Sequence, residues 1–95
     1  MIEVTLRFDA QFRRVTNSDE RLLELPENCS LLEALRHSAE NYAEAFSKRL
    51  FTSAQAVQPT ILVFVNENMV NSQEADQYRL KPGDEVSLYT PIAGG

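Results

Sequence analysis

Apolar and polar residues alternate over the first eight positions of the chain. The apolar members of this alternation are Ile2, Val4, Leu6 and Phe8. Side chains two residues apart lie on the same face of a strand, so the segment predicts a half-buried strand. Residues 17–19 (Asn-Ser-Asp) have turn chemistry, and residues 21–25 resume an apolar pattern that Pro26 ends. These features predict a second strand that forms a hairpin with the first.

A helical spacing of apolar residues begins after this hairpin. Ser30 and Glu33 have the spacing of a capping box, in which each side chain binds the backbone N–H of the other residue. The following apolar positions recur every three or four residues, and they are Leu31, Leu35, Ala39, Tyr42, Phe46 and Leu50. This spacing predicts a helix that starts at Leu31, with a break near Asn41 left open.

The second half of the chain has three further strand patterns. Residues 52–59 are polar and small and predict a loop, and the apolar run 61–65 then predicts an interior strand. Met69 and Val70 suit a short edge strand. Residues 81–84 (Lys-Pro-Gly-Asp) predict a type II turn, with the last strand at residues 85–89.

The order of these elements indicates an α+β protein. A helix must cover the apolar face of a mixed sheet of four to five strands, with the last strand parallel to the first. This is a β-grasp, or ubiquitin-like, arrangement. We expect one β-grasp domain over residues 1–89 and a flexible C-terminal tail over residues 90–95.

Composition narrows the possible functions. The chain has 95 residues, of which 43% are hydrophobic and 24% charged, as expected for one globular domain. A net charge of −5 argues against unaided binding to nucleic acid. One cysteine and one histidine cannot supply a zinc finger or an internal disulfide. No signal peptide or membrane span is visible, so we expect a soluble, cytoplasmic protein without a membrane partner.

The C-terminal end carries the candidate chemistry. Gly94 and Gly95 are two of the three glycines, and they follow Pro91, Ile92 and Ala93. Pro91 directs the chain away from the sheet, and six residues from position 90 onward reach about 20 Å. Glycines suit a narrow channel, and the α-carboxylate is ionised at neutral pH. A frayed or truncated end is the alternative interpretation.

Such a carboxylate is suited to attack on the α-phosphate of ATP. The chain has no Gly-rich phosphate loop and no Cys–His pair to catalyse that step. We therefore expect a carrier rather than an enzyme. The chain itself is expected to bind no cofactor and no metal, and a partner is expected to supply the catalysis.

The strand order, Asn66, the sequence Leu-Lys-Pro-Gly-Asp-Glu-Val at residues 80–86 and the Pro-Ile-Ala-Gly-Gly end resemble the ubiquitin-like sulfur carriers. This family includes the molybdopterin synthase small subunit and the thiamine sulfur carrier. The resemblance implies that an E1-like enzyme uses ATP and Mg²⁺ to adenylate Gly95. Gly95 then becomes a thiocarboxylate that donates sulfur, with Gly94 as the flexible residue before it.

The branch of the family stays open. The resemblance favours the molybdopterin synthase small subunit, with that enzyme's large subunit as sulfur acceptor. Thr90 and Glu67 nevertheless stand where that subunit often has proline and glycine. Carriers for cysteine or for thio-containing natural products are alternatives within the family. Two others are a protein modifier that forms isopeptide bonds and a binding module with an incidental Gly-Gly end.

The partner is expected to bind the outer face of the sheet and the tail. If residues 61, 63 and 65 point into the core, Leu62 and Phe64 point outward beside Tyr89. An apolar patch next to the tail marks a docking surface. The expected partner-binding residues are Leu62, Phe64, Tyr89, Pro91, Ile92 and Ala93.

Two residues could be mistaken for catalytic groups. His37 falls on the outer side of the predicted helix, where a solvated histidine is the expected case. Cys29 lies next to a helix N-terminus, which can lower a thiol pKa, but a small residue at a turn is the favoured interpretation. Neither is assigned a catalytic role.

Overall fold

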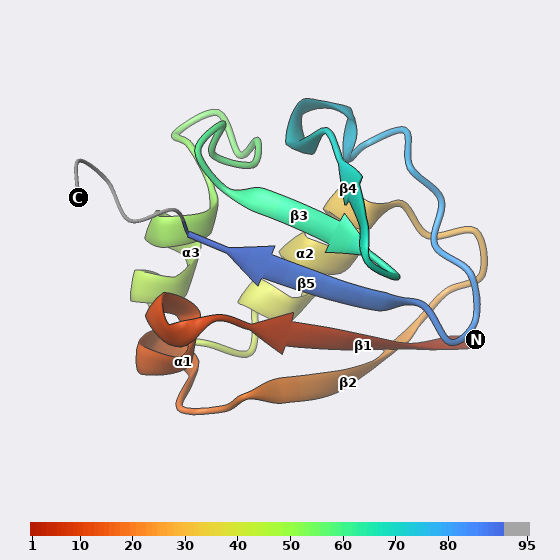
Figure 1. The fold of residues 1–95 in the computed structure, drawn as a ribbon, viewed down its shortest axis with the longest axis horizontal. Coiled ribbons are helices and arrows are strands. Elements are labelled where there is room, and N and C mark those ends of the chain that lie inside the picture. The colour runs from red at the N-terminus through yellow and green to blue at the C-terminus, as the bar shows by residue number, and fades with distance from the viewer. Residues whose placement is uncertain (91–95) are drawn as a thin grey trace.

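Five strands form one mixed sheet in the computed structural model, which describes residues 1–90 (Figure 1). They are β1 (Ile2–Phe8), β2 (Glu20–Leu25), β3 (Leu62–Val65), β4 (Asn68–Val70) and β5 (Glu85–Tyr89). Their order across the sheet is β2-β1-β5-β3-β4. The central pair, β1 and β5, is parallel, and every other pair is antiparallel. The expected α+β, β-grasp class is confirmed.

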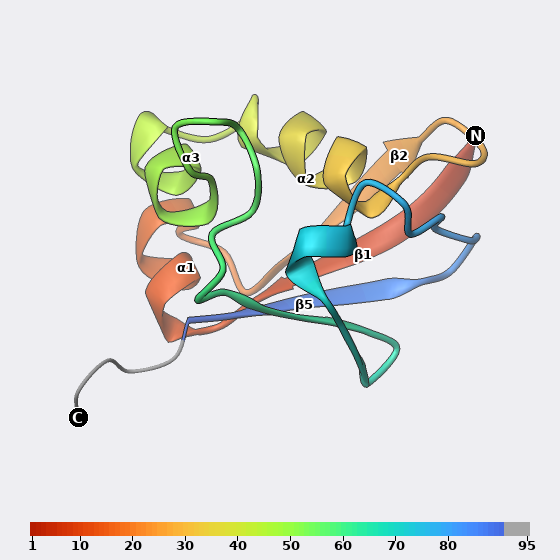
Figure 2. The same cartoon turned by 90° about the horizontal axis from the view of Figure 1, so that it is seen from above.

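Within the described part of the chain, three α-helices, rather than one, accompany this sheet. They are α1 (Ala10–Thr16), α2 (Leu31–Ala39) and α3 (Glu44–Leu50), and a short 3₁₀ helix, η1 (Ser72–Glu74), precedes β5. Figure 2 shows the α-helices on one side of the strands, and no helix among residues 1–90 covers the opposite face of the sheet. This open face is called the outer face below.

The first two strands pair as predicted, but the prediction that a turn alone connects them is wrong. β1 and β2 do pair in antiparallel fashion, but α1 lies between them. The carboxylate of Asp9 accepts a hydrogen bond from Phe12 N–H and so starts α1. Asn17, in the left-handed region at φ 57°, ends it.

The helix predicted from residue 31 is divided in two. Its capping box is present, because Ser30 Oγ accepts from Glu33 N–H at 3.1 Å and the Glu33 side chain accepts from Ser30 N–H at 3.4 Å. α2 then ends at Ala39, and α3 begins after Ala43, which makes no side-chain cap. Both halves still bury their apolar stripe, since Leu31, Leu35, Phe46 and Leu50 are all almost fully buried.

An aromatic cluster fills the space between the helices and the end of β1. This inner aromatic cluster consists of Phe8, Phe12, Tyr42 and Phe46. The rings of Phe8 and Phe46 meet edge to face, with centroids 5.9 Å apart. Phe12 and Phe46 are both 0% exposed. Burial of this size stabilises the fold by about 1.5–3 kcal/mol for each ring.

The turn before β5 has the predicted chemistry. Gly83 has φ 82°, as the third position of a type II turn requires. The buried Asp84 carboxylate accepts from Lys81 N–H and from Asn66 Nδ2, both at 2.8 Å. Asn66 Oδ1 in turn accepts from Glu85 N–H. These bonds fasten the turn after β3 to the start of β5.

None of the helices within residues 1–90 combines the length and the apolar character needed to cross a membrane.

Candidate functional site

The outer face of β3 and β5 carries the side chains that the strand alternation assigned to it. Val63 and Val65 point into the core and are at most 1% exposed. Leu62 and Tyr89 face outward and are 37% and 45% exposed. Phe64 lies between them and is half-buried. The predicted division of residues 61–65 between inner and outer faces therefore agrees with the structure.

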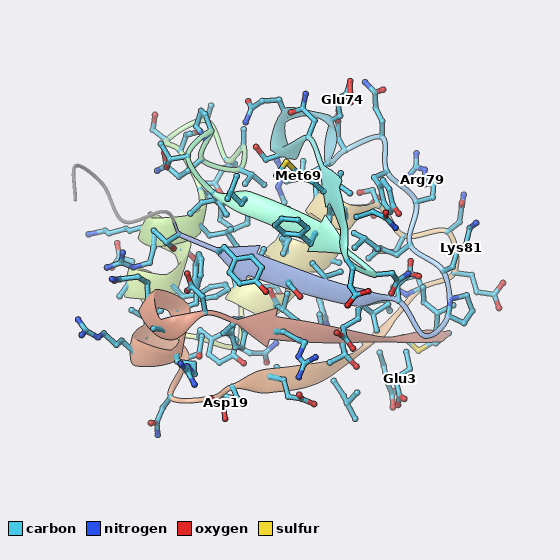
Figure 3. The ribbon with its side chains drawn as sticks, in the orientation of Figure 1. Glu3, Asp19, Met69, Glu74, Arg79 and Lys81 are labelled. Carbon is cyan, nitrogen blue, oxygen red and sulfur yellow. The ribbon has the colours of Figure 1, made fainter. Side chains whose placement is uncertain are left out.

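These outward side chains form one continuous apolar surface. Leu62 lies opposite Tyr89 in the β3–β5 pairing, and the rings of Phe64 and Tyr89 meet edge to face with centroids 5.5 Å apart. Met69, opposite Phe64 in the β3–β4 pairing, extends the surface to the edge of the sheet and is 63% exposed (Figure 3). We call these four residues (Leu62, Phe64, Met69 and Tyr89) the outer patch.

Met69 was missed as a member of this patch. Residues 69 and 70 were assigned to a short edge strand, but the side-chain directions there depend on the register across the turn at Asn66 and Glu67. Both turn residues have positive φ, 51° and 72°. A two-residue connection of this kind places residue 69 opposite residue 64, and that register is the signal that could have identified it.

A charged border lies beside the outer patch on β1, β2 and β5. Arg7 Nη1 donates to Glu85 Oε1 at 2.9 Å, and Arg7 Nη2 lies 3.6 Å from Glu20 Oε1. The hydrogen bond that Arg7 donates to Glu85, followed by the charges of Glu85 and Glu20, raises the pKa of Arg7 above its usual value. Because one guanidinium faces two carboxylates, this border is acidic overall.

A shallow groove of about 850 Å³ joins the border to the patch. Its lining includes the charged residues Arg7 and Glu85 and the aromatic residues Phe64 and Tyr89. The groove reaches Asp9, where β1 gives way to α1. It therefore offers a partner an apolar surface and an acidic surface side by side.

The C-terminal segment begins at the end of this groove. Thr90 N–H donates to Asp9 Oδ2 at 2.6 Å, so the residue after β5 is bonded to the residue after β1. The remaining predicted site residues, Pro91, Ile92, Ala93, Gly94 and Gly95, lie outside the described residues. The structure thus locates the start of the tail, directly next to Tyr89.

Cys29 is not an activated thiol. It is 5% exposed, and its Sγ donates to Ser30 O at 3.4 Å. Burial raises the pKa of the Cys29 thiol, and the nearby Glu33 charge acts in the same direction. The thiol is therefore held neutral despite the adjacent N-terminus of α2. His37 is exposed on α2, as expected for a solvated residue.

Two curated proteins align with almost the whole chain. "Ubiquitin-related modifier 1" of Yarrowia lipolytica is 24% identical over 99 residues, an alignment that covers 99% of this chain and 100% of that protein. "Small archaeal modifier protein 3" of Haloferax volcanii is 29% identical over 94 residues, with coverage of 99% and 100%.

Solved structures show the same fold. SAMP1 of Haloferax volcanii superposes with a TM-score of 0.86 at 20% identity and covers 98% of this chain and 99% of its own. A Pyrococcus furiosus protein, provisionally assigned as molybdopterin converting factor subunit 1, gives a TM-score of 0.75 at 23% identity, with coverage of 97% and 100%. The model of the ThiS family matches residues 6–95, which include the Gly-Gly end. The resemblance to ubiquitin-like sulfur carriers is confirmed, and this chain belongs to the ThiS family.

Proposed function

We propose that this protein is a sulfur carrier whose Gly95 carboxylate is activated by a partner enzyme and converted to a thiocarboxylate. The observation that carries the proposal is the position of the Gly-Gly segment. Gly94 and Gly95 are the fourth and fifth residues after Thr90, and Thr90 is bonded to Asp9 beside the outer patch. The family match that extends to Gly95 supports the same conclusion.

The proposed chemistry has two balanced steps. A carboxylate oxygen of Gly95 attacks the α-phosphorus of ATP, and pyrophosphate leaves as the acyl-adenylate forms. A hydrosulfide ion then attacks the acyl carbon, AMP leaves with the bridging oxygen, and the thiocarboxylate remains after loss of the sulfur-bound proton. The carrier supplies the acyl group, while an E1-like adenylating enzyme supplies the ATP and Mg²⁺ site.

The outer patch is the proposed docking surface for that enzyme. The patch reaches Thr90 through Tyr89, which lies opposite Leu62, so a partner that covers the patch also receives the tail. Residues 91–95 can reach at most about 18 Å from this point. The acidic border favours a partner whose surface combines an apolar pocket with basic side chains.

The sulfur acceptor we propose first is the large subunit of molybdopterin synthase. The sequence resemblance and the name of the similar Pyrococcus furiosus protein support this branch. In it, the chain is the non-catalytic small subunit of a sulfurtransferase in molybdenum cofactor biosynthesis. An enzyme of cysteine or thio-natural-product biosynthesis is the alternative acceptor, reached by the same thiocarboxylate.

A second candidate function is protein modification. The two curated relatives named above are both called modifiers. In this case, a lysine amine of a target protein attacks the activated Gly95 carbonyl, and an isopeptide bond replaces the bond to the leaving group. Activation is common to both functions, and the nucleophile distinguishes them.

Reconstitution with an E1-like adenylating enzyme of the same cell tests the proposal. Purified chain, enzyme, ATP, Mg²⁺ and sulfide are combined, and intact mass is measured. We expect a gain equal to the replacement of one oxygen by one sulfur. A conjugate between the chain and a lysine of the enzyme, or of a lysate protein added in a second reaction, would favour the modifier. If an enzyme that activates another carrier gives neither product with this chain, activation at Gly95 is contradicted.

A truncation that lacks Gly94 and Gly95 is the matched control. It should show no mass gain, while its melting temperature stays close to that of the full chain, because an extended segment adds little to a core. A large loss of stability would mean that these glycines are packed against the domain rather than presented to a partner.

A further inference from the structure

The end of β1 and the end of β5 are joined by a side chain rather than by the backbone. In a parallel pair, each strand alternately donates to and accepts from its neighbour at evenly spaced positions. Asp9 N–H donates to Leu88 O at 3.3 Å, so the next bond in this pattern would run from Thr90 N–H to Asp9 O. That bond is absent, and Asp9 O instead accepts from Arg13 N–H at 2.8 Å, in the first turn of α1.

The Asp9 carboxylate replaces the missing acceptor. Its Oδ2 accepts from Thr90 N–H at 2.6 Å, while its Oδ1 accepts from Phe12 N–H at 3.0 Å. Asp9 therefore lets β1 turn into α1 without releasing the end of β5. Hydrogen bonds to a charged carboxylate are stronger than those between neutral groups.

This bond is placed at the last available backbone donor before the tail. Pro91 has no backbone N–H, so between Tyr89 and Ile92 only Thr90 can hold the chain to the sheet through a main-chain donor. Tyr89, one residue earlier, belongs to the outer patch. Asp9 thus holds Thr90, which joins the outer patch to residues 91–95, against the end of β1.

We infer that Asp9 is a positioning residue, which anchors Thr90 so that residues 91–95 start from a fixed point when the outer patch is bound to its partner. This inference rests on the proposed function, since it concerns how Gly95 reaches the adenylating site. A displacement of about 1 Å in a reacting group can cost a hundredfold in rate, so a loosened anchor acts on catalysis more than on binding.

The Asp9→Asn variant separates this role from helix capping. Asparagine is as good an N-cap as aspartate, but its amide has one acceptor oxygen in place of two. We expect the amide oxygen to keep the cap to Phe12, so that Thr90 N–H faces the amide NH₂ group and loses its acceptor. Asp9→Ser serves as a second variant, because its hydroxyl also caps a helix but is too short to accept both bonds. Asp76→Asn, an exposed carboxylate between η1 and β5, is the control for charge.

Two measurements are made on each variant with the full chain. The first is the rate of pyrophosphate release by the adenylating enzyme as a function of carrier concentration. The second is hydrogen exchange at the amides of Thr90 and Phe12. For Asp9→Asn we expect KM within about twofold, kcat lower by roughly tenfold or more, and faster exchange at Thr90 but not at Phe12. Asp76→Asn should match the wild type in the kinetics of pyrophosphate release and in hydrogen exchange.

An unchanged kcat overturns the inference, whether or not exchange at Thr90 increases. Faster exchange at the Phe12 amide together with a lower melting temperature in both variants would also overturn the inference. Asp9 would then act by stabilising α1 rather than by anchoring Thr90. If the wild-type chain is not adenylated at all, the proposed function fails instead. In that case, exchange at Thr90 still decides whether Asp9 anchors this residue.

Discussion

Two groups of aromatic rings lie on opposite faces of the sheet and use the same contact geometry. Phe8 and Phe46 in the inner aromatic cluster meet at 84° with centroids 5.9 Å apart, and Phe64 and Tyr89 on the outer face meet at 86° and 5.5 Å. Phe46 is 0% exposed, whereas Tyr89 is 45% exposed. Ring geometry alone therefore does not distinguish a core contact from a docking surface. The two are distinguished by whether other parts of the protein cover the rings.

The inner rings are shielded from water by helices and the outer rings are not, so the two groups contribute to different free energies. On the inner face, α1 and α3 remove water from the rings, so their burial already contributes to the stability of the free protein. On the outer face, the same type of surface is still hydrated, and its burial is available to a partner. Substitutions on the two faces should accordingly affect different measurements.

The largest effect on stability is expected for Phe46→Ala. Removing a fully buried ring leaves a cavity next to Phe8 and Phe12, and the free energy of unfolding should fall by about 3–5 kcal/mol. Urea denaturation followed by circular dichroism measures this loss. A free energy of unfolding within about 1 kcal/mol of the wild type would show that the inner cluster is not the core.

Phe64→Asp tests the other face. We expect partner binding to weaken by about 2 kcal/mol or more, roughly thirtyfold in Kd, while the free energy of unfolding changes by only about 1 kcal/mol. Titration with the adenylating enzyme measures the first value.

Leu22→Asp is the matched control for Phe64→Asp. Leu22 is 61% exposed and lies on β2, at the opposite edge of the sheet from the outer patch. The same charge introduced there should leave Kd nearly unchanged. Equal weakening by both variants would mean that charge, and not the outer patch, controls docking.

The smallest effect concerns Cys29 and pH. Because burial raises the pKa of this thiol in the folded state, the unfolded chain loses the proton first as pH increases. The stability contribution of the neutral thiol is complete below the unfolded pKa of about 8.5 and is lost as pH rises above it. Wild type should therefore lose stability faster than Cys29→Ala between about pH 8 and 10. Parallel curves for the two proteins would contradict this.

The sheet could be predicted from the sequence because its signals are local and repetitive. Alternation over residues 2–8 and 85–89 determines which side chains are buried, and Gly83 determines the turn before β5. The parallel pairing of β1 with β5 then follows from the order of the elements. The same alternation identified Leu62, Phe64 and Tyr89 as outward residues.

The features that were missed depend on contacts between distant residues or have weak local signals. α1 has seven residues, of which only Phe12 is buried, so its apolar period is too short to recognise. α3 begins after Ala43 without a side-chain cap, so no cap residue marks the break. The bond from Thr90 to Asp9 spans 81 positions and depends on the β1–β5 register, which no local pattern encodes.

The central claim is that sulfur is carried on Gly95, and the chain allows a direct measurement. Cys29 is the only cysteine, so in Cys29→Ala any thiol-specific alkylation must occur at a sulfur acquired by the chain. Trypsin cleaves after Arg79 and is blocked by Pro82 after Lys81, which leaves residues 80–95 as one peptide.

Cys29→Ala isolated from its own cells is treated with iodoacetamide, digested with trypsin and analysed by tandem mass spectrometry. The account predicts a fraction of the peptide 80–95 that carries one sulfur in place of one oxygen, with the alkyl group located on Gly95. A peptide that ends in an unmodified carboxylate in every preparation, including from cells starved of the sulfur acceptor, would contradict it.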